Sequence, residues 1–520
     1  MKASRQFARR NIQAAGSFSS LSCLLAAALL ISGCGKPASN ASIPGAATAG
    51  PAEPSVPIAP AKEIVESVPP DPKTLAKITE RFAKTPVRPL PQKADVSQSM
   101  NRWQTRADCW RRVFLDGFRA QNTGDDATRA PAEKFLEGYC LRISQSPDAP
   151  ATEELLAQGE RLFETGVRDP HVSQAFAAVL LDSKSDKSPR FAEVLKSLDG
   201  TIHNGKVSPW MTARFHRLKA NVAKQADDAS AWVEHMQGMI EDLLRASSDP
   251  RLTDIDRRML VQLWSDWAGD FPTGPFRVEF TMKLDSTKDI DPWVHEILLA
   301  RLYHTIAWEI RGTGPGGFLP QQFFDNMEHA RRHALRAWEM KPELPEAATL
   351  MLKITMADKG AAGENVRFWF DEAVQADFTC LEAYHSLAWA LRPRWRGNHK
   401  QMLAFGDECL ATGRFDTEIP LMFHQMASGV VEERGSWWVL LEIPGVYERY
   451  NTLFETLAKN ATNDTARNHL RAYLAAVAYL AGKEDRTRQI LNELGSAVNP
   501  EDFAAFELSL DAIREDLGIK

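Results

Sequence analysis

The sequence predicts an all-α protein whose helices pair into hairpins and stack as an α-α superhelix, preceded by a disordered tether. From Ser97 onward, apolar residues recur three, four and seven positions apart, which is the spacing of one helix face. Runs in which β-branched and polar residues alternate, as in half-buried strands, are few. One segment also resembles a second segment 36 residues later, and such internal similarity is typical of helical repeat arrays.

The chain is too long for one compact core, because domains usually stop growing at roughly 250–300 residues. Of its 520 residues, 44% are hydrophobic and 25% charged, which are ordinary values for a folded soluble domain. We divide it into a lipoprotein signal peptide (1–33), a disordered Pro/Ala-rich tether (34–95), an N-terminal helical region (96–290) and a helical repeat domain (291–520).

The N-terminus has the order of parts found in a secretory signal. The first 20 residues contain four basic residues and no acidic one, and the apolar run Leu21–Leu30 follows. That run is shorter than the about 20 residues that a membrane-spanning helix needs. The next four residues, Ile31–Cys34, resemble the bacterial lipobox, whose cysteine is lipid-modified and becomes the new N-terminus. The alternative is an ordinary signal peptide with an incidental cysteine.

Lipidation of Cys34 implies a location in the bacterial cell envelope, facing the periplasm, because acyl chains supply ~0.8 kcal/mol per buried CH₂. The next residue is Gly35 rather than Asp, which by resemblance to the enteric sorting rule favours the outer membrane over the inner. Pro, Ala, Gly and Ser dominate residues 35–72, and such a segment cannot bury enough apolar surface to offset its ordering entropy. We therefore expect a flexible tether that holds the folded part off the membrane.

Individual hairpins can be placed from apolar stripes and stop signals. A helix over about 468–481 precedes Gly482, and the next helix ends at Gly495, where a positive φ is cheapest for glycine. Their apolar faces consist of Leu470, Tyr473, Leu474 and Val477 in the first, and of Thr487, Ile490, Leu491 and Leu494 in the second. A second hairpin flanks residues 392–399, and its first helix carries Tyr384, Leu387, Ala388 and Leu391.

The internal echo pairs Ala334–Ala347 with Phe370–Ala383. The identities are Ala337 with Ala373, Glu346 with Glu382, and Ala347 with Ala383. In the first copy, Ala330, Ala334, Ala337 and Pro342 have the spacing of the small residues and closing proline of a tetratricopeptide repeat. Small residues let two helices approach closely, and proline stops a helix.

Longer segments resemble a bacterial family of tetratricopeptide-like helical domains that has no assigned function. They are Tyr303–Phe318, the two echo copies, Leu391–Cys409 and the Trp- and Tyr-rich stretch Ser436–Tyr450. The resemblance covers roughly Thr152–Gly495 and departs at Arg396, where glycine is expected. It implies an α-α superhelix and no particular reaction.

A basic loop is the most distinctive local feature, and it contains Arg392, Arg394, Trp395, Arg396, His399 and Lys400. It is a candidate docking point for an anionic partner, with an arginine stacked on Trp395. In the alternative interpretation, Trp395 packs in an inter-helix loop and the arginines pair with acids elsewhere.

Three other motifs favour structural roles. The loop Gly312–Gly317 follows no strand, and Pro315 removes one of the N–H donors that a phosphate site needs. Gly200–Val207 approaches a P-loop but lacks the hydroxyl that would hold Mg²⁺. His329 and His333 lie four apart but lack the glutamate of a catalytic zinc helix, so a solvated basic face is expected.

Four cysteines remain after Cys34, and an oxidising envelope favours disulfides among them. Cys109 and Cys140 are expected on neighbouring helices, as are Cys380 and Cys409, which favours these two pairings among the three possible. Buried free thiols are the alternative.

The charge and the absence of catalytic motifs favour a binding protein. Without residues 1–33 the chain has a net charge near −10, so bulk charge does not favour nucleic acid or an anionic bilayer. No catalytic constellation, metal site or cofactor motif is found, so we predict a scaffold that binds protein, with the lipid anchor holding it to the membrane. The alternatives are a hydrolase of an envelope polymer, with a site assembled from distant helices, and a structural spacer without a partner.

Overall fold

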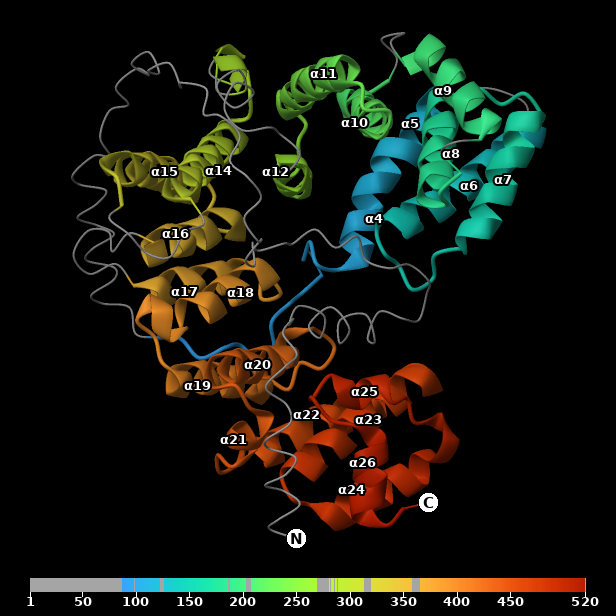
Figure 1. Ribbon diagram of the computed structural model, residues 1–520. Helices are drawn as coiled ribbons and strands as arrows, with labels where there is room; N and C mark the ends of the chain where they lie inside the picture. Colours follow the sequence, from blue (N-terminus) through green and yellow to red (C-terminus); the bar gives the residue numbers. More distant parts are fainter. Residues whose placement is uncertain are drawn as a thin grey trace. The chain divides into compact units, whose positions relative to one another are not determined.

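The chain folds into helices throughout the part that the structure describes (Figure 1). The computed structural model describes residues 87–97, 99–121, 126–185, 188–202, 207–268, 280, 282–284, 286–287, 289–312, 319–357 and 365–519. No strand occurs among these residues, which confirms the predicted all-α class. None of the helices in these ranges is both long and apolar enough to cross a membrane.

The described residues form two compact units. The N-terminal unit contains Asp95–Ala383, and the C-terminal unit contains Arg88–Ala94 together with Tyr384–Lys520. Their boundary therefore falls within one helix, and it does not coincide with the division that we predicted between residues 290 and 291. The short segment 88–94, which we had assigned to the tether, packs in the C-terminal unit, and its Leu90 is buried.

The N-terminal unit consists of hairpins formed by helices that are consecutive in the sequence. Its helices are α4 (Trp103–Arg111), α5 (Gly117–Gln121), α6 (Asp126–Ile143), α7 (Thr152–Glu164), α8 (Pro170–Asp182), α9 (Pro189–Ile202), α10 (Pro209–Gln225), α11 (Ala229–Ser247), α12 (Asp254–Ala268), α14 (Pro292–Arg311), α15 (Gln321–Met340), α16 (Pro345–Ala357) and α17 (Val366–Ala376), followed by the start of α18 (Leu381–Ala390). A π-helical stretch, Arg112–Asp116, joins α4 to α5.

The C-terminal unit begins within α18 and continues the same pattern. Its other helices are α19 (His399–Ala411), α20 (Met422–Arg434), α21 (Trp437–Leu441), α22 (Val446–Asn460), α23 (Asp464–Leu480), α24 (Glu484–Leu494), α25 (Glu501–Ala504) and α26 (Leu510–Leu517). The hairpin predicted near residue 482 is confirmed as α23 and α24, which pack against each other. α23 begins four residues earlier than expected because the Asn463 side chain caps it by accepting from the Ala466 N–H at 2.8 Å.

Small residues allow close helix packing in the N-terminal unit, as expected. α14 and α15 lie side by side (Figure 1), and Ala330, Ala334 and Ala337 of α15 are completely buried. Because alanine adds only a methyl group, two helix backbones can approach each other at such positions. The apolar stripe of α15 therefore serves as a packing surface.

The two echo copies have the same local structure. Lys341 is the C-cap residue of α15, and its N–H donates to the Ala337 carbonyl at 3.1 Å. Asp377 is the C-cap residue of α17, and its N–H donates to the Ala373 carbonyl at 2.9 Å. Backbone φ is −143° at Lys341 and −144° at Asp377, so the backbone leaves both helices in a similar conformation. The next helix, α16 or α18, then begins within four residues. The 36-residue offset is thus a structural repeat at this joint.

A buried ion-pair network joins three parts of the N-terminal unit. The Arg258 Nε atom in α12 lies 2.6 Å from Glu346 Oε1 in α16, and Nη2 lies 2.8 Å from Asp377 Oδ2. The side chains of Arg258 and Asp377 are only 7% and 5% exposed. Asp377 also accepts from the Thr379 N–H at 3.0 Å, so its second oxygen is used. Arg258 therefore compensates two buried carboxylates at once.

An aromatic cluster fills the core of the C-terminal unit around His424 of α20. Its imidazole stacks on Trp437 at 5.8 Å between ring centroids, with an interplanar angle of 10°. The His424 Nδ1 and Tyr450 Oη atoms are 3.0 Å apart, and Phe506 packs against both Trp437 and His424. Burial lowers the pKa of His424 to about 4, so the ring is neutral at physiological pH.

Candidate partner-binding surfaces

The basic loop lies between α18 and α19 in the C-terminal unit. α18 ends at Ala390, and a 3-10 turn over Pro393–Trp395 follows. Asn398 then starts α19, because its side-chain oxygen accepts from the Gln401 N–H at 2.9 Å. Tyr384 of α18 stacks on Phe405 of α19 at 6.2 Å, which fixes the two helices on either side of the loop.

Two arginines of the loop stack on Trp389, a contact that the sequence analysis did not predict. The guanidinium carbons of Arg392 and Arg394 lie 4.6 Å and 4.5 Å from the Trp389 ring centroid. Arg392 also pairs with Glu432 of α20 at 2.9 Å, and its side chain is only 14% exposed. Arg394 remains exposed. The Trp389 ring therefore contacts Arg392, which is fixed by its ion pair, and Arg394, which faces solvent.

The loop turns at Arg396, where the resemblance to the tetratricopeptide-like family implies glycine. Arg396 has φ +76° and ψ 9°, the left-handed conformation that side chains with a Cβ atom disfavour. The next residue, Gly397, cannot be larger, because a Cβ atom there would collide with the Leu391 backbone. The arginine at position 396 therefore keeps the loop shape at an energetic cost.

Replacing Arg396 with glycine is expected to stabilise the protein by about 0.5–1 kcal/mol, because glycine removes the left-handed strain but gains some unfolded-state entropy. Chemical denaturation of Arg396→Gly and the wild type measures the difference. Gly397→Ala is the control and should destabilise the protein. A lower stability of Arg396→Gly contradicts the strain argument.

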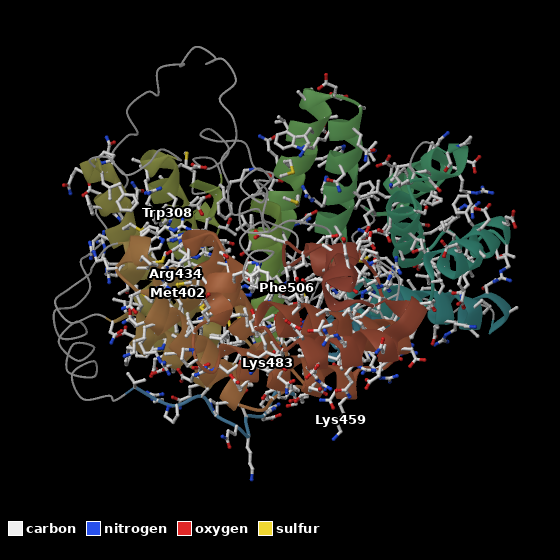
Figure 2. All side chains as sticks on the ribbon, turned by 60° about the horizontal axis from the view of Figure 1, so that its bottom comes forward. Trp308, Met402, Arg434, Lys459, Lys483 and Phe506 are labelled. Atoms are coloured by element: carbon white, nitrogen blue, oxygen red, sulfur yellow. The ribbon has the colours of Figure 1, made fainter. Side chains whose placement is uncertain are left out.

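The rest of the loop divides into fixed and available charges. His399 Nε2 lies 2.9 Å from Glu433 Oε2, and Arg434 Nε donates to His399 Nδ1 at 3.0 Å (Arg434 is labelled in Figure 2). Within the loop, Arg394, Arg396 and Lys400 are exposed cations that pair with no carboxylate among the described residues. Arg392 and His399 thus follow the structural interpretation, whereas these three are available to an anionic partner.

A second surface lies in the N-terminal unit and was not predicted. We call Arg301, His304, Trp308, Lys353 and Glu382 the recessed cluster. Lys353 Nζ lies 2.6 Å from Glu382 Oε1, and Arg301 Nη2 lies 3.5 Å from Glu382 Oε2. Burial raises the pKa of Glu382, but the Lys353 and Arg301 charges hold it well below its usual range. Its side chain is 40% exposed, so this carboxylate is open to solvent.

His304 and Trp308 extend this cluster along α14. Trp308 Nε1 donates to His304 Nε2 at 2.9 Å, which places the proton of a neutral imidazole on Nδ1. Burial, with Lys353 and Arg301 nearby, lowers the pKa of His304 to about 3. Trp308 (labelled in Figure 2) is half-buried, and its ring also lies beneath Arg311 at 5.2 Å. The cluster therefore offers cations, a carboxylate, a neutral donor and an aromatic ring.

The histidine pair of α15 packs against neighbouring side chains. His329 and His333 both stack on Tyr303, at 4.9 Å and 5.6 Å between ring centroids, and His333 Nδ1 lies 2.7 Å from Glu296 Oε2. His333 is buried, so the pair is not the solvated basic face that we expected. Within the described ranges, no three His, Cys, Asp or Glu side chains are grouped to hold a metal ion.

Other predicted features lie wholly or partly outside the described residues. These are Cys34 with the signal peptide, the tether up to residue 86, residues 313–318 of the glycine-rich loop and residues 203–206 of the motif resembling a P-loop.

The structure has the four cysteines as free, buried thiols rather than the predicted disulfides. α4 and α6 do pack against each other, yet Cys109 of α4 lies near α12, with Sγ 3.7 Å from Asp256 Oδ1, and is not bonded to Cys140. Burial raises the pKa of Cys109 and of Cys380 to about 12. Such thiols are unreactive because little thiolate forms.

Thiol counting tests this state. In the mature lipoprotein, with Cys34 blocked by lipid, we expect four reactive thiols after unfolding without reductant, and almost none in the folded protein. The buried thiols become accessible only when the helices separate. The same count with reductant is the control. Fewer than four thiols without reductant, restored to four by reductant, would show that disulfides form in the cell.

The chain matches no known protein-family model, and no curated protein matches it either. The likeness to tetratricopeptide-like domains therefore remains an interpretation of its motifs.

Proposed function

We propose that the chain is an envelope lipoprotein, anchored through Cys34, whose helices form an α-α superhelix that acts as a scaffold for a protein partner. The packing of consecutive helices into hairpins and the repeated joint at Lys341 and Asp377 support the superhelix. The leader and the sequence around Cys34 support the anchor.

The recessed cluster is the observation that carries the binding role. Five groups meet at one partly exposed position of the surface: a carboxylate, two cations, an imidazole and an indole. Packing of the hydrophobic core alone does not require this combination. The Glu382 carboxylate is 40% exposed and lies between the charges of Lys353 and Arg301, so it is open to a partner. Stacked helical hairpins present such inner surfaces to extended partners.

The chemistry of the recessed cluster fits an extended polypeptide. A peptide backbone presents both N–H donors and carbonyl acceptors, and its groups must be satisfied when it is bound. Glu382 can accept, while Lys353 and the His304 Nδ1–H group can donate. Trp308 adds an amphipathic ring of the kind that is enriched at protein interfaces. We therefore assign this surface to a protein segment.

Affinity capture from detergent-solubilised envelopes tests the scaffold. We expect a stoichiometric protein partner with the wild type and at least a 10-fold lower yield with Lys353→Glu, because a second carboxylate beside Glu382 reverses the local charge. Lys459→Glu makes the same change on an exposed residue of α22 and should capture normally. Thermal unfolding of both variants separates lost binding from lost folding.

Two outcomes contradict the proposal. Equal capture by Lys353→Glu and Lys459→Glu would exclude the recessed cluster as the binding surface. Turnover of an envelope polymer that disappears on changing one acidic residue would favour the hydrolase.

A further inference from the structure

The positive charge of the C-terminal unit is concentrated at one place. Residues 383–406 contain four arginines and lysines and no acidic residue, whereas residues 407–520 contain 19 acidic and 11 basic residues. Since like charges repel, an anionic surface would attract this unit mainly through its two segments of net positive charge, the basic loop and residues 88–94. The uneven distribution therefore gives the unit a preferred orientation toward such a surface.

The available cations share one short segment. Arg394, Arg396 and Lys400 are exposed, and they lie at the N-terminal end of α19. Arg394 is held over Trp389, so it loses little side-chain freedom when it contacts an anion. Lysine and arginine at these positions can donate to phosphate oxygens, Arg394 with two parallel N–H groups.

Residues 88–94, near the start of the described chain on the side of the predicted lipid anchor, pack in the same unit. Leu90 is buried in it, and Arg414 Nη1 donates to the Ala94 carbonyl at 2.8 Å. Arg414 follows the C-terminal end of α19, so this docking point and the basic loop lie at opposite ends of a 13-residue helix, about 20 Å apart. Lys93, beside it, is exposed and adds another positive charge.

The length of chain outside the described residues permits contact with the membrane. The 52 residues between Cys34 and Val87 can span up to about 180 Å when fully extended, far more than the unit needs to reach the surface. Attachment also keeps the loop at high local concentration beside the lipids, so a few weak charge contacts suffice. Without attachment, a protein with a net charge near −10 binds such lipids more weakly, so the contact of the unattached chain is measured at low ionic strength.

We propose that Arg394, Arg396 and Lys400 contact the anionic phosphate headgroups of the membrane that holds the lipid anchor, and turn this face of the C-terminal unit toward it. The inference rests on the proposed anchoring through Cys34, but not on the scaffold role of the recessed cluster. Membrane phosphate is favoured over an acidic protein segment because residues 88–94, which belong to the part of the chain that leads toward the anchor, pack in the same unit.

Vesicle flotation of the full chain carrying Cys34→Ala tests this contact without the lipid. We expect more binding to vesicles of phosphatidylcholine with phosphatidylglycerol than to phosphatidylcholine alone, and a loss of the excess in high salt. Arg394→Gln with Lys400→Gln should lower the anionic excess by about 5-fold for each lost cation. The matched control is Lys459→Gln with Lys483→Gln, which removes two other exposed lysines of the unit (labelled in Figure 2).

The comparison has clear contrary outcomes. If both double variants show the same extra binding to vesicles with phosphatidylglycerol, the proposal is overturned. Positive charge anywhere on the unit would then bind the vesicles equally well. If the first double variant loses capture of an acidic protein but keeps its vesicle binding, the loop is a protein site and the membrane contact is wrong. Loss of capture by Lys353→Glu has no bearing on this result, so failure of the scaffold and failure of the membrane contact remain distinguishable.

Discussion

Arg258→Met is expected to destabilise the N-terminal unit by about 3–5 kcal/mol, because removing one partner of a buried ion pair leaves uncompensated charge in the core. In this protein the substitution would leave two carboxylates without a compensating charge, since Arg258 contacts both Glu346 and Asp377. Equilibrium denaturation in urea, with wild type and variant at the same pH, measures the change in free energy of unfolding.

A surface arginine provides the control for this prediction. Arg251 pairs with Asp249 at 2.8 Å, but its side chain is 87% exposed. Arg251→Met should therefore change stability by less than about 0.5 kcal/mol. If both variants lose the same small amount of stability, the network does not join α12, α16 and the end of α17 as the structure indicates.

His424 is expected to make the C-terminal unit sensitive to mild acid. Its pKa is about 4 in the folded protein, against an ordinary value of 6.5, because its aromatic surroundings exclude water. The unfolded chain therefore binds a proton first, and stability present above pH 6.5 is lost as the pH falls toward 4. The loss attributable to His424 is about 2 kcal/mol between pH 7 and pH 4.5.

His424→Gln isolates this contribution from other titrating groups. Glutamine retains a polar group near Tyr450 but cannot ionise in this range, so the variant should be less stable at pH 7 and less dependent on pH. The measurement is the free energy of unfolding at both pH values. An unchanged slope in His424→Gln would mean that the buried ring is already protonated or accessible.

Local patterns in the sequence predicted the helices well, for a physical reason. Helical periodicity and capping depend on residues a few positions apart, so the stripe of α23 and the stop at Gly482 could be identified directly. The start of α23 was missed because Asn463 lies before the apolar stripe. The echo between residues 334–347 and 370–383 was also informative, since both copies form the same helix joint.

Contacts between distant residues could not be predicted in this way. Arg258 and Asp377 are 119 positions apart, and no periodicity indicates that they meet. The recessed cluster was missed for the same reason, although Glu382 had appeared as an identity in the echo and Trp308 in the family resemblance. In the basic loop, the turn at Pro393 brings two arginines over Trp389, and this contact depends on backbone geometry that spacing alone does not specify.

The most direct test of the scaffold is photo-crosslinking in living cells from residue 305. Thr305 is exposed on α14, one helical turn from Arg301 and beside His304. Thr452 of α22 is a matched control, since it is also exposed and its hydroxyl likewise donates to a carbonyl four residues earlier. A photoreactive residue at 305 should give a discrete protein adduct that position 452 does not give and that Lys353→Glu abolishes. The same adducts from both positions, or none from 305, would contradict a partner bound at the recessed cluster.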